Sequence, residues 1–230
     1  MTTDFIVLAV VASTLFLVEI VIRHQREMPI DARETSVSAT VGVLGYSMKA
    51  VVEQLALLAV NFWVADHLAP WRLPFSNPLT WVAYFVVGDF VYYWIHQAKH
   101  RVRILWASHL VHHSAEDFGF TTAVRLSPAE VFYKPFTGLW APLLGFPPAI
   151  YAPMAVLSLQ LQHTEVVGRL GMLDRWFATP SNHRVHHGRN KRYTDKNFGG
   201  QTMLWDHLFG TYEPETEPVV YGSTEALTSR

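Results

Sequence analysis

Eight of the twelve histidines in this 230-residue chain fall in three short clusters, and this pattern restricts the fold more than any other feature. The last cluster is Ser181-Asn-His-Arg-Val-His-His-Gly188, in which the histidines occupy positions i, i+3 and i+4. On a helix this spacing puts the three imidazole rings on one face, where they can converge on a metal. The clustered histidines are His96 and His100 at i and i+4, then His109, His112 and His113, and finally His183, His186 and His187.

The composition limits which metal such histidines could hold. The chain contains no cysteine, which excludes disulfides, zinc ribbons, iron–sulfur ligation and thiol nucleophiles. Imidazole and oxygen ligands suit iron, manganese or zinc better than copper(I). The net charge of −1 provides no broad basic field, so nucleic acid is not an expected partner.

Long apolar runs point to a membrane. Hydrophobic residues make up 50% of the chain, and the mean hydropathy is +0.14. We predict one all-α domain, an integral membrane bundle with a histidine-rich helical cap on the cytoplasmic side. The predicted parts are spanning helices at 5–22, 41–65 and 79–95, a proline-broken hairpin at 131–161, a cap formed by 96–130 and 163–212, and a tail at 213–230.

Flanking charges set the predicted orientation. Arg23 and Arg26 follow the first apolar segment, and Lys99, Arg101 and Arg103 follow the third, so both ends are expected on the cytoplasmic side. The first segment has no basic residue before it and no small-residue cleavage site after it. We therefore interpret it as a retained membrane helix and not as a signal peptide.

Several local signals predict where elements begin and end. Ser127-Pro-Ala-Glu130 has the pattern of a capping box that opens a helix. Thr179-Pro180 is expected to start the helix of the last histidine cluster, and Gly188 to end it. Residues 31–38 are predicted to form a loop or a surface helix, and the tail after Tyr212 to be extended and mobile.

The number of histidines exceeds what one metal needs. A structural zinc takes about four ligands, so eight clustered histidines predict two metals. His163 lies alone in sequence, but it follows the predicted hairpin on the side of the other clusters, and we include it as a ninth ligand. His24, His67 and His207 are expected to be non-ligands.

Three further residues are predicted to support the ligands. Asp89 is a carboxylate within an apolar segment, and we expect it to accept a hydrogen bond from a ligand histidine. The alternative is a helix-packing hydrogen bond to a tyrosine. Tyr93 lies on the same helix face, and Asn197 is included although its role could be only to shape a turn.

Metals beside the hydrocarbon would suit attack on an unactivated C–H bond of a lipid. That chemistry needs a redox metal, which favours iron with dioxygen over zinc. A membrane protein that binds or transports divalent metals is the main alternative, and it would place histidines along a crossing path. A zinc hydrolase is less favoured, because the sequence contains no His-Glu-x-x-His motif.

The motifs also resemble those of a known group, the fatty acid hydroxylase and sterol desaturase superfamily of membrane non-haem di-iron enzymes. The resemblance extends from about Leu79 to Tyr212. It is carried by Asp89-Phe-Val-Tyr-Tyr-Trp-Ile-His96 with His100, by Leu105-Trp-Ala-Ser-His109 with His112-His113-Ser114, by His183-Arg-Val-His186-His187-Gly188, and by Asn197-Phe-Gly-Gly200 followed by Trp205-Asp206 and Leu208-Phe-Gly-Thr-Tyr212.

This resemblance implies a cytoplasmic cap that holds two iron ions, with the eight clustered histidines and His163 as ligands. It implies oxygen-dependent hydroxylation, or desaturation, of a lipid such as a fatty acyl chain, sterol, alkylglycerol or carotenoid. Dioxygen would be the co-substrate. Because the chain is short and shows no fused haem-binding domain, its electrons are expected from an external ferredoxin, reductase or haem protein.

Overall fold

A computed structural model describes residues 2–52, 58–147 and 158–223, and secondary structure in these ranges is helical apart from one antiparallel bridge between Phe177 and Thr202. The described part of the chain thus confirms the all-α prediction. Its helices are α1 (Thr2–Gln25), α2 (Ala32–Val52), α3 (Leu58–His67), α4 (Pro78–Arg101), α5 (Arg103–His113), α6 (Phe120–Val124), η2 (Pro128–Phe132), α7 (Lys134–Thr137), α8 (Trp140–Leu143), α10 (Met172–Trp176), α11 (Pro180–His187) and α12 (Leu204–Phe209).

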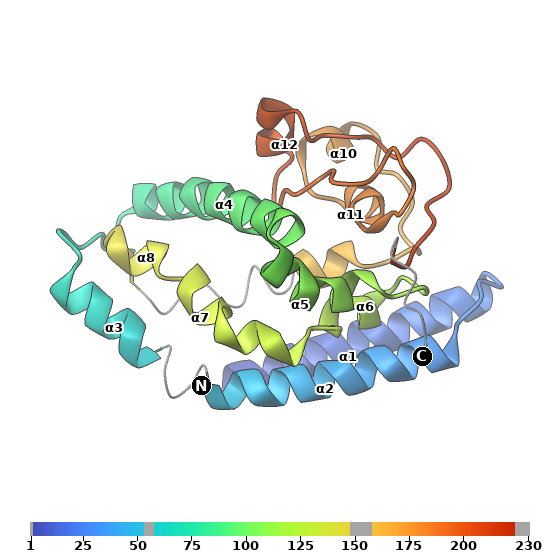
Figure 1. Cartoon of the computed structure of the whole chain (residues 1–230), viewed down its shortest axis with the longest axis horizontal. Coiled ribbons are helices and arrows are strands. Elements are labelled where there is room, and N and C mark those ends of the chain that lie inside the picture. The colour runs from blue at the N-terminus through green and yellow to red at the C-terminus, as the bar shows by residue number, and fades with distance from the viewer. Residues whose placement is uncertain (1, 53–57, 148–157, 224–230) are drawn as a thin grey trace.

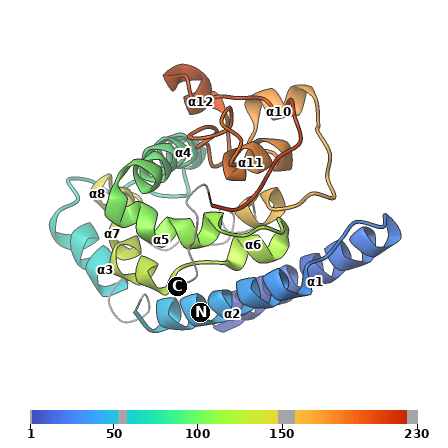
Figure 2. The same ribbon diagram turned by 45° about the vertical axis from the view of Figure 1, so that its right-hand side comes forward.

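The long helices α1 and α2 run side by side along one edge of the molecule, and α4 lies along the opposite edge (Figure 1). Helices α5 and α6 lie between these two edges in both views, and α10, α11 and α12 form a lobe above them (Figure 2). The chain therefore brings its C-terminal third over the end of α4 and over α5, the two helices that carry the first histidine clusters.

The predicted spans correspond only partly to the helices. Helix α1 contains 5–22 and α4 contains 79–95, whereas the predicted span 41–65 is divided between α2, α3 and residues outside the described part. Within the described residues, none of the helices combines the length and the apolar character that a membrane crossing requires. The integral membrane architecture stays a prediction.

Helix α2 begins earlier than the predicted second span, and the reason is local. The Asp31 carboxylate accepts hydrogen bonds from the backbone N–H groups of Arg33 (2.8 Å) and Glu34 (3.0 Å). These bonds satisfy two of the free donors at a helix start, so the chain becomes helical at Ala32. Of the two predictions for residues 31–38, helix is correct and loop is wrong.

One extended residue directs α4 into α5. Asn77 caps the start of α4 by accepting from the backbone N–H of Leu79, and Pro78 occupies the first turn. At the other end Val102 is extended, with φ −95° and ψ 113°, and α5 starts immediately after it. This break turns the chain back against α4, so the histidines of both helices face the same space.

The predicted hairpin is only partly described. Ser127 Oγ caps the element as predicted, but it accepts from the backbone N–H of Ala129 and not from that of Glu130 as a capping box requires, and the element is a 3-10 helix of five residues. Pro135 lies in α7 and Pro142 lies in α8. Both helices are short, because proline lacks the N–H that a longer helix needs. Residues 148–157 of the predicted hairpin lie outside the described part.

Residues 213–222 contain no helix or strand, in agreement with the prediction of an extended tail, and they are hydrogen-bonded and packed against the cap. Tyr193 Oη donates to the Glu217 carbonyl (3.0 Å) and accepts from the backbone N–H groups of Thr216 and Glu217. Tyr221 stacks on Phe118, with ring centroids 4.9 Å apart and planes 7° from parallel. This segment packs on the cap because it supplies hydrogen-bond partners and an aromatic ring to buried residues.

Candidate metal centre

The structure brings all nine predicted histidines together in two adjoining groups. Within each group one ring nitrogen per residue lies within 4.8 Å of the others. His24, His67 and His207, the predicted non-ligands, lie outside both groups. The five-histidine group contains His96, His100, His109, His113 and His186, and the four-histidine group contains His112, His163, His183 and His187.

Helices α5 and α11 serve both groups. Because consecutive histidines on a helix point in different directions, His113 and His112 enter different groups, and so do His186 and His187. The His113 and His187 rings stack across the boundary between the groups, with centroids 4.2 Å apart. The two groups therefore form one continuous centre.

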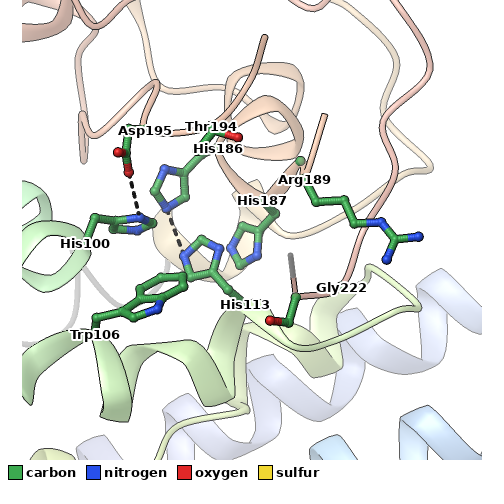
Figure 3. Close-up of a pocket in the computed structure, with 11 residues that line it drawn as sticks. His100, Trp106, His113, His186, His187, Arg189, Thr194, Asp195 and Gly222 are labelled. Atoms are coloured by element: carbon green, nitrogen blue, oxygen red, sulfur yellow. Dashed lines mark hydrogen bonds and ion pairs between the residues drawn. The ribbon is translucent and has the colours of Figure 1, made fainter. Parts of the chain in front are cut away.

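Helix α11 has the predicted limits. It starts at Pro180 after Thr179 and ends before Gly188. Asn182 ties its first turn to the preceding helix by donating to the carbonyls of Asp174 (2.6 Å) and Phe177 (2.8 Å). Figure 3 shows that His186 and His187, from this helix, point toward His113 of α5.

Backbone carbonyls set the orientation of three rings. His96 Nδ1 donates to the Phe198 carbonyl (3.0 Å), His186 Nδ1 to the Lys196 carbonyl (3.0 Å), and His163 Nδ1 to the Leu159 carbonyl (2.6 Å). A carbonyl oxygen only accepts hydrogen bonds, so these Nδ1 atoms carry the proton. Each Nε2 of the neutral ring then presents a lone pair toward the other histidines.

The distances between facing ring nitrogens indicate whether a cation fits between them. His163 Nε2 lies 3.2 Å from His112 Nε2 and 2.8 Å from His183 Nε2, and His186 Nε2 lies 3.2 Å from His113 Nε2. One lone pair on His163 cannot satisfy two neighbours as an acceptor. Further buried ring nitrogens have no hydrogen-bond partner, namely His100 Nε2, both nitrogens of His109, His112 Nδ1 and His187 Nε2.

A buried polar atom without a partner costs about 1–3 kcal/mol, and coordination to a cation would remove that cost for several nitrogens at once. Imidazole nitrogen is a ligand that iron accepts readily. The nine histidines thus fit two metal ions of this class, with a five-nitrogen and a four-nitrogen donor set.

The protonation state of the centre also favours a metal. Burial lowers the pKa of all nine imidazoles, and positively charged or imidazole neighbours lower most of them further. The pKa of His112 falls to about 3. The rings are therefore neutral near pH 7, and neutral imidazole is the form that binds a metal ion.

Asp89 does not have the predicted partner. Its carboxylate accepts hydrogen bonds from the backbone N–H of Gln201 (2.8 Å), from Thr202 Oγ1 (2.6 Å) and from Trp205 Nε1 (3.1 Å), and these partners are neither a histidine nor a tyrosine. The residue on α4 thus anchors residues 201–205 of the cap. The sequence could not indicate these partners, since two of the three are a backbone group and a tryptophan far along the chain.

Tyr93 and Asn197 form hydrogen bonds to residues other than the clustered histidines. Tyr93 Oη lies 2.9 Å from Thr211 Oγ1 and accepts from Gln97 Nε2 (3.1 Å). Asn197 lies between the two residues whose carbonyls hold His186 and His96, and its φ of 56° is in the left-handed region. Asn197 therefore shapes the turn that orients two of the clustered histidines, which combines the two roles that the sequence left open.

Sequence analysis missed the groups that contact the rings from outside. Asp195 Oδ1 lies 3.7 Å from His100 Nδ1, and Glu130 Oε1 lies 3.9 Å from His109 Nδ1. Asp206 accepts from the backbone N–H groups of Phe198 and Gly199, fixing the turn at residues 197–200. The Asn-Phe-Gly-Gly pattern indicated the turn that Asp206 fixes, whereas no local pattern indicated that Asp195 or Glu130 lies beside a histidine ring.

A pocket of about 160 Å³ reaches the five-histidine group from the surface of the cap (Figure 3). His100, His113 and His186 line it together with His187. Trp106 forms part of its wall and contacts the His100 ring, with centroids 5.1 Å apart. Small molecules from the cap side can thus approach the five-histidine group.

Comparison with known proteins agrees with this centre. The model of the fatty acid hydroxylase family matches residues 81–211, which include all nine histidines. Human alkylglycerol monooxygenase is 39% identical over 208 residues, covering 87% of this chain and 45% of that protein. An ornithine lipid hydroxylase of Rhizobium tropici is 29% identical over 180 residues, covering 76% of this chain and 53% of that protein.

The chain spans less than half the length of the alkylglycerol monooxygenases that it matches. No solved structure matches it. The family model nevertheless covers more than half of the chain, and it covers every histidine of the two groups. This chain belongs to the fatty acid hydroxylase family, as its histidine motifs indicate.

Proposed function

We propose that this chain is an integral membrane enzyme that holds two iron ions and uses dioxygen to hydroxylate a lipid. The observation that carries the proposal is the pair of adjoining groups, in which buried neutral imidazoles direct unshared nitrogen lone pairs toward common points. Two sites of four or five nitrogens exceed the needs of a single catalytic zinc.

The residues divide between two tasks. The five-histidine group would hold one iron ion and the four-histidine group the other, and bound iron would supply the activation of dioxygen that attack on an unactivated C–H bond requires. The carbonyls of residues 159, 196 and 198 keep the ligand rings in one tautomer and one orientation. The pocket beside His100 gives dioxygen a path from the cap surface.

The names of the relatives guide the choice of substrate. Alkylglycerol monooxygenase, ornithine lipid hydroxylase and a fatty acid hydroxylase of Lecanicillium, which is 32% identical over 163 residues, are all named for lipids. We propose alkylglycerols as the first class to test, because the human and Caenorhabditis elegans alkylglycerol monooxygenases cover 87% and 86% of this chain. Hydroxylation and desaturation share hydrogen abstraction, so desaturation is the second outcome to measure.

Exposed apolar side chains support the membrane location. Helix α4 exposes Leu79, Val82, Val86 and Phe90 at helical spacing along one side. The same helix carries His96 at its C-terminal end. A lipid lying along α4 would therefore have an apolar route toward the metal centre, which we place at the cytoplasmic face next to the basic residues at 99–103.

Electrons must come from a donor outside the chain segment described here, because the side chains of the centre store none. A ferredoxin with its reductase, or a haem protein, would supply two electrons for each hydroxylation. The competing proposal, a membrane metal transporter, is disfavoured because the nine histidines converge in one place and do not follow a path across the molecule.

The decisive experiment is metal analysis of the protein purified in detergent under reducing conditions. We expect about two irons per chain, and lipid products with one added oxygen when dioxygen and an electron donor are supplied. His186→Ala should lose iron and activity, whereas His24→Ala, which changes an exposed histidine, should keep both. Zinc alone, with no oxygen consumption, would contradict the proposal.

A further inference from the structure

Helix α1 carries a buried carboxylate that reaches the surroundings of the four-histidine group. Glu19 is only 3% exposed, although the sequence places it in an apolar segment. Its Oε2 accepts from the backbone N–H of Phe120 (2.7 Å), and its Oε1 accepts from Thr164 Oγ1 (2.6 Å). One side chain of α1 therefore joins two segments that are far apart in the chain.

Both of these segments border the four-histidine group. Thr164 directly follows His163 in the chain. Phe118, two residues before Phe120, stacks on the His163 ring with centroids 5.5 Å apart and lies 5.1 Å from the His187 ring. A shift of either segment would thus move a ring of this group or the aromatic side chain that packs against it.

The Glu19 carboxylate packs closely against the backbone at Gly119. A Cβ atom at Gly119 would lie 2.9 Å from Glu19 Oε2, so the carboxylate occupies the space that a side chain would need. One turn further along α1, Arg23 donates to Asp117 Oδ1 (2.8 Å) and to the Phe118 carbonyl (2.6 Å). Its guanidinium also lies 3.5 Å from Glu165. Two neighbouring residues on α1 therefore bind the same two segments.

The five-histidine group is oriented from a different part of the chain. The carbonyls that hold His186 and His96 belong to Lys196 and Phe198, within the turn after α11. Glu19 lies outside residues 81–211, which the family model matches, while its hydrogen bonds end beside residues inside that range. The two groups thus differ in their dependence on α1.

We propose that Glu19 is a positioning residue for His163 and, through it, for the metal of the four-histidine group; the inference rests on the two-metal function proposed above. The carboxylate fixes the Thr164 hydroxyl and the peptide at Phe120. These bonds hold the residue after His163 and the ring against which His163 packs, so that its Nε2 faces His183 and His112.

The test compares the two metal affinities of the purified full chain. Cobalt(II) serves as the probe because its absorption reports each bound ion without turnover, and a competing chelator measures affinity. Glu19→Ala should weaken one of the two cobalt ions about 10–100-fold, the range typical of lost partners of metal ligands, and leave the other unchanged. Glu19→Gln, which keeps one acceptor oxygen, should lose less. His24→Ala, on the same helix, should match the wild type.

A second pair of variants separates positioning from folding. Thr164→Val removes the hydroxyl and should weaken the same ion, and Thr164→Ser should restore its affinity. Wild-type affinities in Glu19→Ala would overturn the proposal while leaving the two-metal site intact. Equal weakening of both ions, with loss of helical content, would show a general folding role instead. A wild-type chain that binds no cobalt would overturn both the proposed function and this inference.

Discussion

His183 Nε2 lies 2.8 Å from His163 Nε2, although His183 belongs to the last histidine cluster and His163 lies outside all three clusters of the sequence. His183 opens the last histidine cluster on α11, and His163 follows the helical residues 158–162. His163 Nδ1 donates to the Leu159 carbonyl, so the nitrogen that faces His183 carries a lone pair. An isolated histidine and a clustered one thus contribute to the same donor set.

His163→Ala is expected to remove about one of the two irons per chain. The four-histidine group would keep three nitrogens and gain space where His163 contacts His112 and His183, while the five-histidine group would be intact. Iron analysis after gel filtration checks the stoichiometry. His207→Ala is the matched control, because His207 Nε2 donates to the Arg175 carbonyl outside both groups. Two retained irons in His163→Ala would exclude His163 as a ligand.

The metal-free protein should lose stability as the pH falls below about 6.5. Burial keeps the pKa of all nine imidazoles below the value of an unfolded histidine, and that of His112 at about 3. Below about pH 6.5 the unfolded chain binds protons that the folded chain does not, which lowers the free energy of unfolding. Above that pH these groups contribute no pH dependence.

Each such imidazole contributes a slope of up to about 1.4 kcal/mol per pH unit. Asp206 acts in the opposite direction between about pH 3.8 and 6, because burial raises its pKa to about 6, but the nine imidazoles together outweigh it. Thermal unfolding of chelator-treated protein between pH 8 and 5 measures the effect. An unfolding temperature that is flat or rising toward pH 5 would contradict it.

The sequence indicated eight of the nine histidines through their spacing, because ligand spacing on a helix is a local property. The spacing i, i+3, i+4 in α5 and α11 needs only helical geometry to place the rings on one face. The division of the rings into two groups depends on how α4, α5 and α11 cross. No local sequence pattern predicts this crossing. The same limit applies to His186, whose orienting partner is a backbone carbonyl with no side-chain signature.

The fold was predictable to the same extent. Thr179, Pro180 and Gly188 mark the limits of α11 correctly, because these signals lie next to the helix that they delimit. The partners of Asp89 and the packing of residues 213–222 depend on contacts between distant parts of the chain. The terminal position of the segment after Tyr212 predicted mobility, whereas the buried groups that bind this segment are not visible in its own sequence.

Glu215→Ala should destabilise the cap strongly. The Arg184 guanidinium is buried on α11 and contacts both Glu215 carboxylate oxygens, at 3.1 and 2.8 Å, and Ser181 Oγ donates to the same carboxylate (2.6 Å). Removing one partner of a buried pair leaves an uncompensated charge, which costs about 3–5 kcal/mol. Denaturant unfolding followed by far-UV circular dichroism measures the loss.

The pair of Arg192 with Glu213 provides the control for this prediction. Its Nε to Oε1 distance is 2.6 Å, but the Arg192 side chain is 55% exposed, so Glu213→Ala should cost less than about 1 kcal/mol. Glu215→Gln keeps an acceptor for Arg184 and should fall between the two alanine variants. Equal losses in Glu213→Ala and Glu215→Ala would show that the segment after residue 212 does not stabilise α11 through Arg184.

Asn197→Ala is predicted to weaken the metal of the five-histidine group. Asn197 Nδ2 donates to the carbonyls of Asn182 (3.2 Å) and Glu213 (2.8 Å), and its Oδ1 accepts from the backbone N–H of Glu213 (2.8 Å). Its left-handed φ of 56° is also unfavourable for alanine, by about 1–2 kcal/mol. The substitution therefore removes both the anchor and the preferred conformation of the turn at residues 196–198.

Displacement of this turn would move the carbonyls that hold His186 and His96, and loss of such partners lowers metal affinity about 10–100-fold. Chelator competition should show that one of the two metals is released more readily, while the ion of the four-histidine group is retained. Asn197→Gly tolerates the positive φ but lacks the side-chain hydrogen bonds, so it separates the two causes. If Asn197→Gly binds both metals as tightly as the wild type while Asn197→Ala does not, backbone conformation alone fixes the turn; if both variants bind normally, the carbonyls of residues 196 and 198 do not control the ligands.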